Sequence, residues 1–217
     1  MKQGLFTIIE NVPIADKVMK MRLRGDLSAI TAPGQFVNIK IDELYLRRPI
    51  SVCDAEDDIL TLIYKVVGTG TEIMSGMQSG ALDILTGLGN GYDLNCCGDA
   101  PLLLGGGVGV PPLYLLAKKL LKNGKSVRAV LGFNRKSDVF YEDEFRSLGV
   151  DTTPTEVTEN TALLPTHCRA TTLIFTPAAP NRCYTPYTKR QIPQGNSALK
   201  NAWAAASARA WAAPARP

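Results

Sequence analysis

Short apolar runs of alternating character dominate the first half of the chain. They cover residues 4–12, 17–25, 34–41, 50–56 and 59–68, they are rich in β-branched residues, and Gly, Pro, Asp or Asn separates them. Alternation with a period of two between such boundaries is typical of strands that bury one face. The pattern therefore predicts a small antiparallel barrel or sandwich.

The pattern changes after Asp99. Residues 101–107, PLLLGGG, are a continuous apolar run into glycines, residues 111–124 have helical spacing and end at a glycine, and residues 126–133 are another apolar run. Buried strand, helix and buried strand in succession indicate a parallel βαβ unit. We predict a β + α/β protein, in which an antiparallel barrel precedes an incomplete doubly wound, Rossmann-like domain and an irregular tail.

Charge and composition indicate a boundary near residue 150. Residues 1–150 hold 17 basic and 17 acidic residues, so the formal net charge of +4 belongs to the segment after Val150, which also holds both tryptophans and the single histidine. A positive charge excess confined to a tail does not indicate a nucleic-acid-binding surface, and we expect no nucleic-acid partner. The expected divisions are 1–97 for the barrel, 98–150 for the first part of the α/β domain, and 151–217 for a poorly ordered tail.

The remaining composition favours a cytoplasmic protein. Hydrophobic residues make up 45% and charged residues 20% of the chain. The longest apolar stretch, PLLLGGGVGVPPLYLLA, is interrupted by glycine and proline, and the first residues lack the apolar centre of a signal peptide. The five cysteines then read as reduced thiols, and we expect no membrane partner.

A glycine-rich turn between the predicted strand and helix carries the first candidate chemistry. Glycines let a backbone approach a ligand closely, prolines suit the first turn of a helix, and the helix N-terminus attracts a pyrophosphate. An alternative is that the glycines only pack the strand against the helix. The candidate dinucleotide-binding residues are Gly105, Gly106, Gly107, Val108, Gly109 and Pro111.

Four segments in a fixed order make the interpretation more specific. RRPISVCD at 47–54 and IYKVVGTGT at 63–71 are followed by LGNGYDL at 88–94 and LLLGGGVGVPPLYLLAKKL at 102–120. With these motifs the chain, from about residue 5 to residue 150, resembles the electron-transfer subunits of the NAD-linked, class B dihydroorotate dehydrogenases, which belong to the ferredoxin reductase superfamily.

The resemblance implies a site for FAD. An arginine in the family's Arg-x-x-Ser strand pairs with the pyrophosphate and the serine lies near the flavin ring, roles that suit a bidentate guanidinium and a hydroxyl. Purely structural roles also remain open: Tyr64 as a sheet aromatic, Lys65 as a solvated strand residue and Gly70 as a hairpin glycine. The residues implied are Arg48, Pro49, Ile50, Ser51, Ile63, Tyr64, Lys65, Gly70 and Thr71.

The resemblance also implies an activity. In the family, this subunit exchanges a hydride with NAD at FAD and passes single electrons through a [2Fe–2S] cluster to an FMN-containing catalytic subunit, which oxidises dihydroorotate in pyrimidine biosynthesis. The two kinds of subunit form a heterotetramer. One alternative is a related flavoprotein subunit of the sulfide dehydrogenase or glutamate synthase type. Another is an inactive, FAD-binding fragment. The sequence singles out no catalytic side chain.

Three cysteines invite a metal hypothesis, which we reject. Cys53, Cys96 and Cys97 lack the CxxC spacing that lets two thiolates converge on one metal, and no histidine lies nearby in the sequence. We interpret them as buried small hydrophobic residues. No set of metal ligands is expected in this chain.

The tail lacks the motifs with which the family continues, namely DGSxG, CGPxPM and the cluster-binding CGxGxCxxC. A neighbouring reading frame restores them, because alanine codons, GCN, then read NGC, and tryptophan followed by alanine reads Met, Leu or Val followed by Gly. That frame permits DGSYGEHGFVTD over residues 155–166, FYTCGPEPML over 175–184 and RMGCGFGACMGCSC over 202–215. We infer that the frame changes between Asp151 and Pro154, and that alanines at positions 205, 210 and 213 replace cluster ligands. The alternative is a natural Ala/Pro-rich tail or short surface helix.

Overall fold

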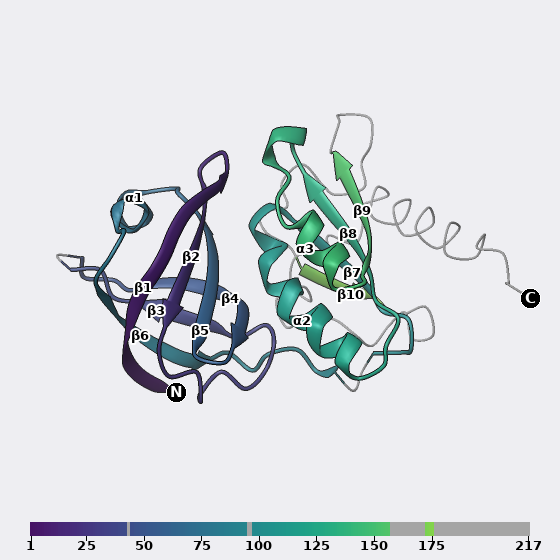
Figure 1. Ribbon diagram of the computed structural model, residues 1–217, viewed down its shortest axis with the longest axis horizontal. Coiled ribbons are helices and arrows are strands. Elements are labelled where there is room, and N and C mark those ends of the chain that lie inside the picture. Colours follow the sequence, from purple (N-terminus) through teal and green to yellow (C-terminus); the bar gives the residue numbers. More distant parts are fainter. Residues whose placement is uncertain (43, 95–96, 157–171, 176–217) are drawn as a thin grey trace, which may run out of the picture.

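The computed structural model describes residues 1–42, 44–94, 97–156 and 172–175, which form a barrel beside an α/β layer (Figure 1). Six strands of the described residues close the barrel in the order β1-β2-β5-β4-β3-β6, with antiparallel neighbours throughout. The predicted barrel is thereby confirmed. Its strands are β1 (Lys2–Ala15), β2 (Val18–Arg24), β3 (Phe36–Ile39), β4 (Arg48–Glu56), β5 (Ile59–Lys65) and β6 (Ala81–Leu88).

The alternating residues of these strands fill the barrel. Along β2, Met19, Met21 and Leu23 are buried while Arg22 and Arg24 reach the surface. Apolar side chains from the other five strands of the barrel pack against them, and several of these side chains are fully buried. Burial of this kind stabilises the fold by roughly 25 cal/mol for each Å² of apolar surface. The barrel core includes Phe6, Val37, Ile39, Val52, Leu60, Leu62, Tyr64, Met74, Leu82 and Ile84.

A short helix, α1 (Thr69–Gly76), lies between β5 and β6 at one end of the barrel (Figure 1). The buried side chain of Asn11 anchors it, since Asn11 Nδ2 donates to the carbonyl oxygens of Met74 and Met77, at 2.8 Å each. The sequence indicates only a turn at Gly70. The helix is stabilised by a tertiary contact from β1 and by the burial of Met74, neither of which is visible in a local pattern.

The second layer is a sheet of order β10-β7-β8-β9, in which β7, β8 and β9 are parallel. The helix α2 connects β7 to β8, so the predicted βαβ unit is confirmed. Strand β10 runs antiparallel to β7. The elements are β7 (Leu102–Gly106), η2 (Gly107–Gly109), α2 (Pro111–Lys122), β8 (Arg128–Phe133), η3 (Lys136–Asp138), α3 (Glu142–Ser147), β9 (Asp151–Glu156) and β10 (Thr172–Phe175).

Regular structure continues past residue 150, farther than the expected boundary. Strand β9 pairs with β8 along its whole length, from Arg128 opposite Asp151 to Phe133 opposite Glu156. Backbone N–H and C=O groups of residues other than proline can pair with an existing strand largely independently of their side chains, which explains why an unpromising sequence becomes a strand here. The described residues exclude His167, Trp203, Trp211 and almost all of the stretches on which the frame interpretation depends.

Barrel and sheet share one apolar junction. Val18, Cys53 and Ile63 of the barrel belong to the same buried cluster as Leu113 and Leu116 of α2. The helix α2 lies along β4 and covers the face of the sheet that is turned to the barrel (Figure 1). This junction places the start of α2 in a fixed relation to β4.

Candidate dinucleotide site

The guanidinium of Arg48 lies against the backbone of Gly70. A Cβ atom added at Gly70 would overlap the Arg48 side chain, so only glycine lets Arg48 settle on the first turn of α1. Arg48 Nη1 also donates to the carbonyl oxygen of Leu46. The structure thus brings together two predicted site residues, which are 22 positions apart in the chain, from β4 and α1.

The two adjacent arginines have different surroundings. Arg47 Nη2 makes an ion pair of 2.8 Å with Asp83 Oδ2, and its hydrogen bond holds the pKa of Asp83 below the ordinary value. In the described part of the chain, Arg48 has no carboxylate partner. A half-buried guanidinium that lacks a counter-charge is suited to a phosphate, which accepts two of its hydrogen bonds at once.

Pro49 and Ser51 stand on the outer face of β4. Both side chains are exposed, whereas Ile50 between them is half-buried against the barrel core. The alternation follows from the pleat of a strand, which turns successive side chains to opposite faces. The Ser51 hydroxyl is therefore available to a ligand on the outer surface, on the same strand as Arg48.

The three predicted residues of β5 fall into different environments. Ile63 is buried in the junction and Tyr64 in the barrel core, where the Tyr64 hydroxyl donates to Asn11 Oδ1 at 3.1 Å. Only Lys65, at the end of the strand, is exposed. Of these three side chains, Lys65 alone is open to a ligand, and the side chain of Tyr64 behaves as a core aromatic.

Thr71 shapes the turn before α1. Its Oγ1 accepts from the backbone N–H groups of Val67, at 3.0 Å, and Gly68, at 3.2 Å, and donates to the carbonyl oxygen of Gly68 at 2.9 Å. A hydroxyl has one donor and two acceptor positions, and all three are occupied here. Thr71 thus holds the loop against α1, while a Cβ at Gly68 would meet nothing within 4 Å. The open backbone at Gly68, the guanidinium of Arg48 and the hydroxyl of Ser51 fit an extended, phosphate-bearing ligand such as FAD.

The glycine-rich turn contains both packing glycines and open glycines. A Cβ at Gly105 would lie 2.6 Å from Leu113 Cδ1 and 3.1 Å from Val110 Cα, so this glycine is required where β7 packs on α2. Gly107 has a φ of +49° and open space where a Cβ would stand. The packing interpretation therefore holds for Gly105, while ligand binding at Gly107 stays a prediction. The other predicted residues lie between β7 and α2: Gly106 at the end of β7 and Val108 in η2 are half-buried, whereas Gly109 in η2 and Pro111 at the first position of α2 are buried.

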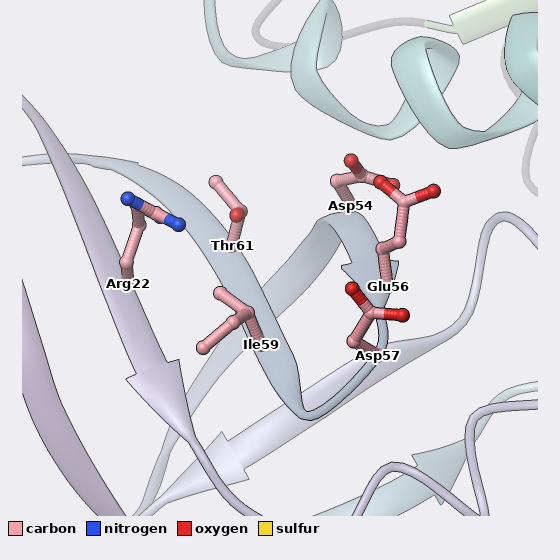
Figure 2. A pocket seen from close by; sticks show the side chains of 6 residues that line it. All are labelled: Arg22, Asp54, Glu56, Asp57, Ile59 and Thr61. Atoms are coloured by element: carbon pink, nitrogen blue, oxygen red, sulfur yellow. The ribbon is translucent and has the colours of Figure 1, made fainter.

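A polar cluster joins α2 to β4, where sequence reasoning had identified nothing. Lys118 Nζ lies 3.0 Å from Asp54 Oδ2 and 2.8 Å from Glu56 Oε2. Figure 2 shows Asp54 and Glu56 beside Asp57 at the rim of a surface hollow of about 230 Å³. None of the predicted FAD or NAD residues lines this hollow. No signal in the sequence singles out Lys118, since Lys119 and Lys122 lie on the same helix.

Two of the cysteines are buried in the junction. Cys53 packs near Tyr141, and burial raises the pKa of its thiol far above the ordinary value. Cys97 is buried in the same cluster, while Cys96 lies outside the described residues. Among the residues that the structure describes, no three or more His, Cys, Asp or Glu side chains gather as a metal site. No described helix has the length and apolar character that spanning a membrane demands.

Comparison with solved structures defines the class of fold. An NADH-dependent reduced ferredoxin-NADP oxidoreductase is 31% identical, with a TM-score of 0.63 over 70% of this chain and 57% of that protein. A ferredoxin NADP⁺ reductase from Neisseria gonorrhoeae with bound FAD and NADP is 17% identical, with a TM-score of 0.63 over 72% of this chain and 69% of that one. The barrel and the α/β sheet together have the ferredoxin reductase fold.

Curated relatives then give the family. The electron transfer subunit of dihydroorotate dehydrogenase B (NAD(+)) from Bacillus pumilus is 46% identical over 158 residues, 69% of this chain and 61% of that protein. Its counterpart from Fusobacterium nucleatum is 45% identical over 152 residues, 66% of this chain and 59% of that protein. No protein-family model matches the chain. The chain is homologous to the electron transfer subunits of dihydroorotate dehydrogenase B, and it spans about three fifths of the length of these relatives.

Proposed function

We propose that the chain acts as the electron transfer subunit of a dihydroorotate dehydrogenase B and exchanges electrons between NAD and a bound FAD. The observation that carries the proposal is the half-buried guanidinium of Arg48, which lies on Gly70 without a carboxylate partner, on the strand that exposes Ser51. The names of the curated relatives support this role. Residues 1–97 serve as the FAD domain and residues 98–150 begin the NAD domain.

Each part of the site has a physical task. Arg48 neutralises the pyrophosphate and holds it by bidentate hydrogen bonds. Ser51 offers a hydroxyl to the edge of the flavin ring, and Gly107 lets the pyrophosphate of NAD approach the backbone before α2. Bound FAD supplies the conversion between two-electron and one-electron transfer. Lys118 keeps these two binding segments together through Asp54 and Glu56.

The electron path beyond FAD is a finer proposal. It leads through a [2Fe–2S] cluster to an FMN-containing catalytic subunit, in a heterotetramer. Such a cluster needs four ligands, usually cysteine thiolates. In the frame as written, Ala205, Ala210 and Ala213 have no donor atom, so we propose that cluster binding requires the neighbouring frame.

Reconstitution with flavin tests the proposal. The purified chain, freed of flavin and then mixed with FAD, should retain the flavin absorbance through gel filtration. It should also shift that absorbance relative to free FAD, because the ring enters a less polar surface. A chain that folds, as judged by circular dichroism, but retains no FAD would overturn the proposal. NADH added anaerobically then reports whether the glycine turn positions the nicotinamide.

A further inference from the structure

Tyr141 has a backbone conformation that suits glycine or asparagine. Its φ and ψ are +66° and +9°, in the left-handed region, where a bulky side chain is strained. Its carbonyl oxygen accepts from the backbone N–H of Phe145 at 3.1 Å, at the start of α3. A glycine or an asparagine would begin this helix in the same way with less strain. A tyrosine at this position therefore indicates a task for the ring itself.

The Tyr141 ring packs against the first turn of α2. Its centroid lies 5.2 Å from the centroid of Tyr114, with the two rings at 80°, and the Tyr114 ring lies 5.4 Å from that of Phe145. Edge-to-face pairs at such separations are attractive beyond the apolar area that they bury. Because α2 begins at Pro111, directly after the glycine turn, Tyr141 contacts the part of the α/β layer nearest to the proposed NAD site.

On its other side, Tyr141 meets the barrel at Cys53 of β4. Cys53 is fully buried in the junction and packs near Tyr141, and burial raises the pKa of both side chains. Val52 faces the barrel core, so Cys53 shares the outer face of β4 with the exposed Ser51. Two residues of a strand span about 7 Å. Tyr141 therefore contacts β4 close to the hydroxyl that we assign to the flavin ring.

We propose that Tyr141 is a positioning residue that holds the start of α2 against β4 and thereby sets the distance between the glycine turn and the flavin ring at Ser51. The inference rests on the proposed function, since it assumes NAD at the glycine turn and FAD at Ser51. Hydride transfer needs the reacting atoms about 3–3.5 Å apart, so a small shift between the layers slows it. Lys118 and Asp54 connect α2 to β4 one turn farther along the helix, whereas Tyr141 acts at its first turn.

Alkylation of Cys53 by N-ethylmaleimide, followed by mass spectrometry of the peptide that contains it, measures how tightly the layers are held. Tyr141→Asn keeps the left-handed start of α3 but removes the ring, so Cys53 should react at least about tenfold faster than in the parent. Tyr141→Phe retains the ring and should retain most of the protection. Phe140→Leu is the matched control, because the Phe140 ring pairs with Phe133 of β8, 5.1 Å away, within the α/β layer.

The chain loaded with FAD gives a second readout. Tyr141→Asn should leave the affinity for FAD within about twofold of the parent, because the charge-assisted contact of Arg48 remains. The maximal rate of flavin reduction by NADH should fall about tenfold or more, because the nicotinamide is held less precisely. If the parent chain holds no FAD, or holds FAD that NADH does not reduce, the proposed function fails. Cys53 alkylation still decides in that case whether Tyr141 holds the junction.

Two results would overturn the inference while leaving the proposed function intact. One is an unchanged rate of Cys53 alkylation in Tyr141→Asn. The other is an equal increase in Phe140→Leu, since the loss of any ring in the α/β layer would then have the same effect. Circular dichroism of each variant checks that both layers are folded. If Tyr141→Asn does not fold, Tyr141→Leu, which keeps an apolar side chain without a ring, replaces it with the same expected result.

Discussion

Lys118 of α2 lies 3.0 Å from Asp54 of β4, so an ion pair connects the helix behind the glycine turn to the strand of the proposed flavin site. Ser51 comes three residues before Asp54 on that strand, and α2 begins two residues after Gly109. Apolar packing at the junction holds the two layers together, but it is not directional. The ion pairs of Lys118 with Asp54 and Glu56 add a contact at one defined position of α2 along β4.

Lys118→Met should weaken the junction only modestly. The Lys118 and Asp54 side chains are 28% and 17% exposed, and Glu56 is 64% exposed, so solvent screens much of the attraction. We expect a loss of about 1 kcal/mol or less in the free energy of unfolding, measured by urea denaturation. Lys119→Met is the matched control, because Lys119 is exposed on the same helix. An equal effect of the two substitutions would contradict the role of the cluster.

The same cluster predicts a pH dependence. Burial alone would lower the pKa of Lys118, but hydrogen bonds to Glu56 and Asp54 raise it above its ordinary value, and the bond from Lys118 lowers the pKa of Glu56. The contribution of Glu56 is thus present above the ordinary pKa of a glutamate and is lost as the pH falls through its lowered pKa. That of Lys118 is lost as the pH rises through its raised pKa. The difference between the parent and Lys118→Met should therefore be largest near neutral pH.

Gly70→Ala should displace Arg48 without unfolding the barrel. The new methyl group would occupy the place of the guanidinium, while α1 itself tolerates alanine well. We expect weaker FAD binding, by tenfold or more, if Arg48 binds the pyrophosphate where it now lies. Gly76→Ala is the control on the same helix, because a Cβ there meets nothing within 4 Å. Equal FAD affinity in both variants would mean that Arg48 can bind from another position.

The elements that the sequence predicts are those whose periodicity is local. The alternating runs mark β1 to β5, and the change from alternating to continuous apolar residues after Asp99 marks the βαβ unit. The strand β6 also alternates, in ALDILTGL, but its signal is easily missed behind the glycines on either side. Helices α1 and α3 have eight and six residues, too short for a helical period to show.

For the candidate site, the sequence predicts which residue types bind the ligand, which stays a prediction, and it leaves the geometry open. Motif order identifies Arg48, Ser51 and Gly70, but only the fold shows that Arg48 lies on Gly70 and that Tyr64 points into the core. The partners of Lys118 lie 62 and 64 residues away along the chain, a separation that no local pattern encodes. Residue types therefore indicate the ligand, whereas tertiary contacts decide which side chains reach it.

Arg48→Ala should reduce FAD retention strongly. The substitution removes a charged donor to phosphate, and charge-assisted bidentate contacts are about twice as strong as neutral hydrogen bonds. We expect a loss of affinity of about tenfold to a hundredfold in a flavin fluorescence titration. Arg48→Lys should restore only part of it, since an ammonium cannot form the planar fork. Unchanged flavin content in Arg48→Ala would contradict the assignment.

The frame interpretation predicts a specific DNA sequence. Between the codons for Asp151 and Pro154, the gene should carry one inserted or deleted base, or another number that shifts the frame equally, relative to a gene that encodes the cysteine-rich motifs. Sequencing the encoding DNA from the source and from related strains checks this. A protein made from the restored frame should show the electron paramagnetic resonance signal of a reduced [2Fe–2S] cluster. An intact gene that encodes the alanine-rich tail in related strains would contradict the interpretation.

The hydrogen bonds of Asn11 make it a position on which the barrel end depends. Asn11 is 2% exposed, donates to Met74 and Met77, and accepts from Tyr64. Asn11→Ala removes three hydrogen bonds at the end of the barrel and leaves the Tyr64 hydroxyl without this partner, so we expect a loss of about 3 kcal/mol in the free energy of unfolding. Tyr64→Phe removes one of these bonds and should cost about 1 kcal/mol. Equal losses in the two variants would show that the contacts to α1 contribute nothing.

Tyr64 also predicts how the stability of the barrel changes in alkali. Burial raises the pKa of Tyr64 to about 12 from 10.0, an effect that the hydrogen bond to Asn11 opposes. Above pH 10 the unfolded chain releases this proton while the folded chain still holds it, so the free energy of unfolding should fall between pH 10 and pH 12. Tyr64→Phe has no proton to release and should show a shallower fall, measured by denaturation at pH 8, 10 and 11.5. Parallel pH profiles for the parent and Tyr64→Phe would mean that other groups cause the alkaline loss.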